Sequence, residues 1–158
     1  MIHAFLPFFR WADHTAVAVW IRDSTWVFAL LEVFHLFGLT LLLGTLVVVN
    51  LRLFGWGLAG HPLSEVAADA LPFTIWGMIA TIASGSLLFV SEALKCYASA
   101  PFFVKMGLLA VALLFTFTFH RYLTKKDTPP SPTTKFAAGL CLTLWFGVGL
   151  AGRAIAFF

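Results

Sequence analysis

The sequence predicts an all-α integral membrane protein, a four-helix bundle built as one domain over residues 1–158. Hydrophobic residues make up 61% of the chain and charged residues only 11%, whereas an ordinary soluble domain carries about 25% charged residues. The apolar residues gather in four runs, each close to the roughly 20 residues that a bilayer-crossing helix needs. These runs are too long for barrel strands, so each is predicted to be a helix.

A short interfacial helix is predicted before the spans, over about residues 11–22. Trp11 and Trp20 would anchor it at the membrane surface, and the segment is too polar and too short to cross. Each apolar run that follows is predicted to be one membrane-spanning helix. The four spans are predicted over about residues 26–51, 71–94, 101–122 and 136–158.

Residues that begin helices, or interrupt them, lie at the ends of these spans. Asp23 and Ser24 form a capping pair ahead of the first span. Pro72 is expected to begin the second span, and Pro101 lies where the first turn of the third tolerates proline. The polar, proline-rich stretch 125–135 is predicted to be a loop between the third and fourth spans.

The basic residues predict the orientation of the chain. We call the side of the membrane on which the chain begins the N-terminal side, and the other the loop side. The loop side is the more basic, with Arg52, Arg121, Lys125, Lys126 and Lys135 against Arg10, Arg22 and Lys95. The positive-inside rule then makes the loop side cytoplasmic. We therefore expect a multi-pass protein of the bacterial inner membrane with both termini in the periplasm.

Composition argues against several other classes of protein. The net charge is +3, but the basic residues gather in a loop beside the bilayer, so no nucleic-acid partner is expected. Cys96 and Cys141 should lie at different depths and form no disulfide. The opening residues 1–10 lack the basic region of a signal peptide. No phosphate loop, HExxH or CxxC motif is present, and nothing indicates a hydrolase.

Five ionisable residues lie inside the apolar spans in the half nearer the N-terminal side. They are Glu32, His35, Glu92, Lys105 and Arg153. A charge at mid-membrane costs roughly 2.5–3.5 kcal/mol on insertion scales, so these groups are expected to face the protein interior. On a rise of about 1.5 Å per residue, all five lie in the half of the bundle nearer the N-terminal side. Their charges nearly balance, so we expect Glu32, His35 and Arg153 to approach one another, with Glu92 and Lys105 above them.

An interfacial position is the alternative for several ionisable residues of the spans. Glu92, Lys105 and Arg153 are close enough to the surface for it, since lysine and arginine side chains extend readily towards water. His120 lies at the loop-side end of the third span, about 15–20 Å in depth from His35. It is expected to be interfacial and bonded to a loop. Paired ligation of one haem by His35 and His120 would require strongly tilted helices, and His120 stays the reserve ligand.

Small residues mark the predicted packing faces of the helices. They are Gly38 and Gly44 on the first span, Gly77, Thr81, Ser84 and Gly85 on the second, and Gly149 and Gly152 on the fourth. Such residues allow close approach of helices in membranes. They would equally leave room for a flat cofactor ring beside a histidine.

The chain resembles a bacterial family of four-span inner-membrane proteins of unknown function. The resemblance rests on "LEVFHLFGLTLLLGTLVVVNLRLFG", "PFTIWG", "FFVKMGLL" and "GLAGRAIAFF", and it covers nearly the whole chain after Ser24. The matching pattern comprises His35, Lys105, His120 with Arg121, and Gly152 with Arg153. More distantly, the chain is similar to copper-resistance D-type proteins and small b-type cytochromes. The resemblance implies the fold, and only the distant similarity implies a redox cofactor.

The leading expectation is a membrane redox subunit that binds haem b, or a related tetrapyrrole, near His35. His35 would be the iron ligand, Lys105 and Arg153 would neutralise propionates, and Glu32 would orient the imidazole. One alternative is a non-catalytic subunit, or a proton or metal-ion conduit, that uses the Glu32, His35 and Arg153 cluster. Another is a quinone-binding subunit. Beyond the lipid bilayer, the expected partners are other membrane subunits or a quinone.

Overall fold

The computed structural model describes residues 5–58, 60–126, 129–155 and 157. These described residues form helices and connecting turns, with no strand among them. Four helical segments are long and apolar enough to cross a membrane. They are α3 (Val27–Phe54), α4 (Leu63–Ser91), the continuous run Ala100–Lys125, and α8 (Pro132–Ala154). The predicted all-α, four-span architecture is therefore confirmed.

The third span is not one regular α-helix. It consists of α6 (Ala100–Phe115), a π-helical turn η2 (Thr116–His120) and the short helix α7 (Arg121–Lys125). A π-helical turn inserts an extra residue into the hydrogen-bond ladder and often occurs at functional sites. Here it determines where His120 points.

The second span begins earlier than predicted. α4 starts at Leu63, directly after Pro62, so Pro72 lies inside the helix and does not begin it. The prediction placed the start where the sequence becomes continuously apolar. The preceding turns are amphipathic instead: Leu63 and Val66 are buried, whereas Glu65 is exposed. These turns gain stability from packing on one face, which a count of apolar residues does not detect.

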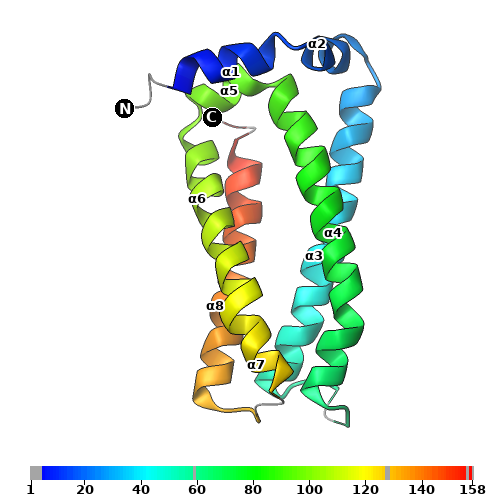
Figure 1. The fold of residues 1–158 in the computed structure, drawn as a ribbon, viewed down its shortest axis with the longest axis vertical. Helices are drawn as coiled ribbons and strands as arrows, with labels where there is room; N and C mark the ends of the chain where they lie inside the picture. Colours follow the sequence, from blue (N-terminus) through cyan, green and yellow to red (C-terminus); the bar gives the residue numbers. More distant parts are fainter. Residues whose placement is uncertain (1–4, 59, 127–128, 156, 158) are drawn as a thin grey trace.

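The four spans form two hairpins, α3 with α4 and α6 with α8 (Figure 1). Contacts between α3 and α8 join the hairpins. In Figure 1 the hairpins meet near α7 at the loop side and lie farther apart towards α1 and α2. The apolar core between them consists of Leu42, Leu46, Ala112, Cys141, Trp145 and Val148. These residues lie nearer the middle of the spans, so other residues pack the N-terminal end of the bundle.

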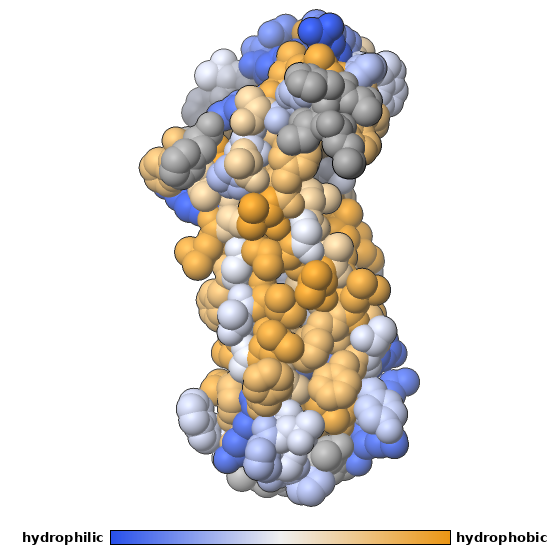
Figure 2. All heavy atoms as spheres, turned by 90° about the vertical axis from the view of Figure 1, so that its left-hand side faces the viewer, coloured by the Kyte–Doolittle hydropathy of each residue, from blue (hydrophilic) through white to orange (hydrophobic). Residues whose placement is uncertain are grey.

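The exterior of the bundle matches a lipid environment. On the face drawn in Figure 2, a broad hydrophobic band covers the middle of the molecule, and hydrophilic residues gather at both ends. Many large apolar side chains on the spans are exposed, among them Phe37, Trp76 and Leu114. Exposed apolar surface of this extent is expected where lipid, and not water, surrounds the protein. The protein is therefore a multi-pass membrane protein in contact with the bilayer.

The predicted interfacial helix is in fact two helices. α1 (Leu6–Asp13) and α2 (Ala16–Asp23) lie across the N-terminal end of the bundle, together with the short α5 (Ala93–Ala98) (Figure 1). Thr15 separates α1 from α2, because its side chain accepts a hydrogen bond from the Ala18 amide and caps α2. Trp11 and Trp20 are 67% and 62% exposed, as anchors at a membrane surface would be.

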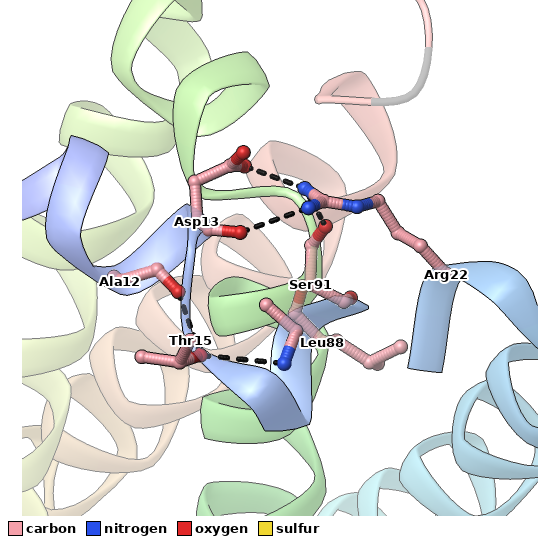
Figure 3. A network of polar contacts seen from close by, with 7 residues as sticks. Ala12, Asp13, Thr15, Arg22, Leu88 and Ser91 are labelled. Atoms are coloured by element: carbon pink, nitrogen blue, oxygen red, sulfur yellow. Dashed lines mark hydrogen bonds and ion pairs between the residues drawn. The ribbon is translucent and has the colours of Figure 1, made fainter. Parts of the chain in front are cut away.

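Arg22 fixes this corner onto the end of α4 (Figure 3). Its guanidinium lies 2.8 Å from the Asp13 carboxylate and donates to the Asp13 carbonyl, also at 2.8 Å. It donates a third bond, at 3.2 Å, to the carbonyl of Ser91, the last residue of α4. One side chain thus ties α1, α2 and α4 together with charge-assisted hydrogen bonds.

The fold predicts that Lys126 and the C-terminus lie on opposite sides of the membrane, because one span separates them. Single cysteines placed at Lys126 and at Phe157 should therefore react with a membrane-impermeant thiol reagent from opposite sides of sealed vesicles. Reaction of both from one side would contradict the four-span fold. If the cysteine at position 126 reacted from the periplasmic side and the one at position 157 from the other side, the four-span fold would stand and only the predicted orientation would be reversed.

The native cysteines should not interfere with that labelling. Both are buried thiols, and burial raises the pKa of Cys96 from its ordinary value of 9.0 to about 11. The folded protein therefore keeps this thiol protonated between pH 9 and 11, whereas the unfolded chain ionises it. We expect Cys96 to resist maleimide at pH 9 in the native protein and to react after denaturation. Unfolding should also become easier as pH rises through this window.

Candidate functional site

His35 is held by the neighbouring span. Its side chain lies half-buried between α3 and α4, with Nδ1 3.0 Å from the Ser84 hydroxyl oxygen. The Ser84 hydroxyl donates its only proton to the carbonyl of Ala80. It must therefore accept from His35, so Nδ1 carries the proton and Nε2 carries a free lone pair. Gly85 faces the ring, because a Cβ there would lie 3.0 Å from His35 Cε1.

A histidine that binds a metal is held in the same way. Ligating histidines usually donate their other ring N–H to a protein oxygen, which fixes both the tautomer and the ring plane. Glu32 was predicted to have this orienting role. That prediction is wrong, since the bond at Nδ1 is made by Ser84.

Lys105 belongs to the inward stripe of the third span. It lies two helical turns (112 − 105 = 7 residues) before Ala112, which is fully buried in the core. Its ammonium borders α8, since a Cβ on Gly152 would lie 3.2 Å from Lys105 Nζ. It is also near enough to His35 for the two to interact electrostatically. Among the described residues Lys105 forms no ion pair or hydrogen bond, so an inward cation lacks a counterion.

The other ionisable residues do not form the expected cluster. Glu32 and Arg153 are both exposed, and the described residues contain no ion pair between spans. Arg153 instead lies over the Phe157 ring, 5.0 Å from its centroid. Glu92 pairs with Lys95 at 2.9 Å. Near the water boundary each of these groups finds a local partner or solvent, so none needs a partner across the bundle.

Glu32 nevertheless lies on an inward stripe of α3. It precedes Leu46 by 14 residues (46 − 32), four turns along the same stripe, and Leu46 is buried against α8 in the core. At this end of α3 the stripe therefore carries an exposed carboxylate, on the same helix as the half-buried His35.

His120 belongs to a separate, fully buried network. It is 4% exposed, and its Nε2 lies 3.1 Å from Oδ1 of Asn50, which is completely buried. Asn50 also donates to the Leu46 carbonyl at 2.7 Å. The expectation of an interfacial histidine bonded to a loop is therefore wrong. The π-helical turn orients His120 inwards, towards α3.

Three further residues extend this network to α8, beginning with Cys141, whose thiol lies within hydrogen-bonding reach of the Asn50 side chain. Trp145 donates its indole N–H to the Thr116 hydroxyl at 2.9 Å, and the Cys141 sulfur lies 3.9 Å from the same hydroxyl. We call Asn50, Thr116, His120, Cys141 and Trp145 the Asn50 network. It joins α3, the π-helical turn and α8 inside the bundle. Buried polar groups that satisfy one another in this way fix the relative positions of helices.

The two histidines cannot share one ligand. Asn50, which holds His120, follows His35 on α3 by 15 residues (50 − 35), or about 22 Å along the helix axis. The reserve model of paired ligation by His35 and His120 therefore does not fit. Nor do the described residues contain a group of three or more His, Cys, Asp or Glu side chains able to hold a metal ion.

Two pockets lie away from His35. One, of about 650 Å³, is a groove on the outer surface of α3 and α4, bordered by Gly44, Glu65 and Asp69. The other, of about 210 Å³, lies between α4 and the η2–α7 segment, bordered by His120, Arg121 and Lys125. Neither is lined by His35.

The sequence analysis did not predict that Ser84 would bond to His35, or that Asn50 would bond to His120. Ser84 was expected only to be a small packing residue. Its separation from Gly77 by seven residues placed it on the correct face of α4 but gave no partner. Asn50 carried a stronger signal, because it is an amide in the apolar run "LVVVNLRLF" and so requires a hydrogen-bonding partner.

Fold and site together define a multi-pass, four-helix membrane protein with a hydrogen-bonded histidine near one membrane surface. The chain belongs to a family of unknown function, DUF6644, whose model matches residues 8–158. No curated protein and no solved structure matches it. Membership of a family of unknown function was predicted, whereas the distant similarity to copper-resistance D-type proteins and small b-type cytochromes stays a prediction.

Proposed function

We propose that the protein is a membrane redox subunit that binds haem b, or a related tetrapyrrole, at His35. The observation that carries the proposal is the fixed imidazole. Ser84 holds Nδ1, and Nε2 is left with a lone pair. A neutral imidazole nitrogen of this kind is a common axial ligand of haem iron.

Lys105 supports the anionic part of such a ligand. Its ammonium faces inwards without a counterion among the described residues. An unpaired cation inside a membrane protein is costly and gains most from a bound anion. A haem propionate would supply that charge at the end of the bundle nearest water. Arg153, which is exposed over Phe157, is the weaker propionate partner.

Small residues support the positions of the two binding groups. The imidazole of His35 occupies the space beside Gly85, and the Lys105 side chain occupies the space beside Gly152, so a larger residue at either point would displace them. When bound, the iron would supply one-electron transfer. The role of the chain would be to fix the ring through His35, balance its charge through Lys105 and exclude water with the α1–α2 corner.

The alternatives have less support. A quinone could accept a hydrogen bond from Lys105 through a carbonyl oxygen, but it carries no charge and would leave this cation without a counterion. A metal-ion conduit requires several ligands, and the described residues offer no such group. A proton path or an ion-paired scaffold would require Glu32, His35 and Arg153 to form a cluster. Glu32 and Arg153 are exposed and form no ion pair with another described residue, so this reading has less support.

We further propose a bacterial inner-membrane location with both termini periplasmic, on the basis of the positive-inside rule.

Haem content of purified variants tests the proposal. His35→Ala should eliminate bound haem, measured as the pyridine haemochrome per mole of protein. His14→Ala, which changes an exposed histidine near the same membrane surface, should retain it, and so should the folded fraction of His120→Ala. Ser84→Ala should weaken haem binding roughly 10- to 100-fold, as loss of a ligand's hydrogen-bond partner typically does. Full haem retention by His35→Ala would refute the assignment.

A further inference from the structure

We propose that the pocket between α4 and the η2–α7 segment binds the phosphate headgroup of an anionic phospholipid. This loop-side pocket lies at the opposite end of the bundle from His35 and is independent of the function proposed above. Its volume of about 210 Å³ is smaller than the roughly 300–1,000 Å³ of sites for drug-sized ligands. A pocket of this size suits a headgroup and not a large soluble cofactor.

The charges around the loop-side pocket are all of one sign. Arg121 and Lys125, one turn apart on α7, both line it. No Asp or Glu is among its lining residues. The acidic residues of this part of α4, Glu65 and Asp69, border the outer groove instead. The pocket is therefore selective for an anion.

The two cations are free to bind a ligand. The side chains of Arg121 and Lys125 form no ion pair or hydrogen bond with another described residue. Their neighbour Lys126 differs, because its ammonium bonds to the Tyr122 hydroxyl and lies over that ring. The polar groups deeper in the pocket are already bonded within the protein, as His120 is to Asn50. The anion would therefore be bound by Arg121 and Lys125.

The position of the loop-side pocket indicates a lipid as the source of that anion. Lys125 is the last residue of the third span, so the cations lie at the level of lipid headgroups. The remaining walls are largely apolar, with Leu46, Val49, Leu71 and Phe117 among them. Acyl chains could continue along such walls, whereas a free anion would gain nothing from them. Basic pockets between spans bind anionic lipid headgroups in this way.

Lipid-dependent thermal stability of the full-length protein tests the proposal. The purified protein would be titrated in neutral detergent with phosphatidylglycerol, with phosphatidylcholine, or with inorganic phosphate. Phosphatidylglycerol should raise the midpoint of unfolding and phosphatidylcholine should not. In Arg121→Gln/Lys125→Gln the apparent affinity for phosphatidylglycerol should fall roughly thirtyfold. If inorganic phosphate raised the midpoint of unfolding as much as phosphatidylglycerol does, the proposal that the anion belongs to a lipid would be refuted.

Two further variants separate the pocket from general surface charge. Lys126→Gln removes a neighbouring charge outside the pocket lining and should keep the wild-type response. Ala68→Phe fills the pocket, which Ala68 lines, without changing charge and should lose the response. If Lys126→Gln weakened binding as much as removal of Arg121 and Lys125, or if Ala68→Phe bound normally, a specific pocket would be excluded.

Discussion

Replacing Gly77 by leucine is expected to separate α3 from α4 and to unfold much of the bundle. A Cβ at position 77 would lie 2.7 Å from the backbone nitrogen of Leu42 and 3.0 Å from the carbonyl oxygen of Gly38. These are backbone atoms of α3, so no side chain can move aside to make room. Even Gly77→Ala should cost about 1–3 kcal/mol, as overpacking of a tight interface does.

The loss can be measured as the SDS concentration that half-unfolds the protein in mixed micelles. Gly44→Ala is the matched control on α3, because nothing lies within 4 Å of a Cβ built there. It should leave the midpoint unchanged or raise it slightly, since alanine favours helix more than glycine does. Equal midpoints for Gly77→Ala and Gly44→Ala would show that α3 and α4 do not pack as closely as described.

The second large effect is expected in the Asn50 network. Asn50→Leu leaves the buried His120 imidazole without its partner, which should cost about 1–3 kcal/mol. His120→Leu should cost a similar amount, because the Asn50 amide oxygen then lacks its donor. The double variant removes both polar groups together, and replacing both partners by apolar residues can be nearly neutral. The double variant should therefore be more stable than either single variant.

The same SDS titration gives this double-mutant cycle. A coupling energy of at least about 1 kcal/mol between positions 50 and 120 is expected, in the range measured for contacting residues. Thr40→Val is a suitable control, since Thr40 is exposed and its hydroxyl bonds only to its own helix. If the two losses simply added, the hydrogen bond between His120 and Asn50 would contribute nothing.

Sequence predicted the spans well because the property that defines them is local. Hydrophobic length alone located four helices, and the start of the first was predicted within one residue, at 26 against Val27. The errors occur where stability comes from packing or hydrogen bonding. The first turns of α4 are amphipathic, and the interfacial segment is divided at Thr15, whose side chain caps the second of two helices.

The site was harder to predict, because its hydrogen bonds join residues on different helices and the sequence does not show which residues face one another. Depth arguments placed His35 and Lys105 correctly in the same half of the bundle. They could not give the rotation of each helix, and so grouped Arg153 with His35 although Arg153 is exposed. The π-helical turn changes the direction of His120 by its extra residue, and neither periodicity nor composition indicated such a turn in the third span.

The central claim is that His35 holds a haem, and an absorption spectrum tests it most directly. The wild-type protein would be expressed with an ample supply of haem precursor, purified in mild detergent and measured before and after reduction with dithionite. The account predicts a Soret band that sharpens and shifts on reduction, at a stoichiometry approaching one haem per chain. A protein that is folded and monodisperse yet shows no Soret band, even after incubation with haemin, would contradict it.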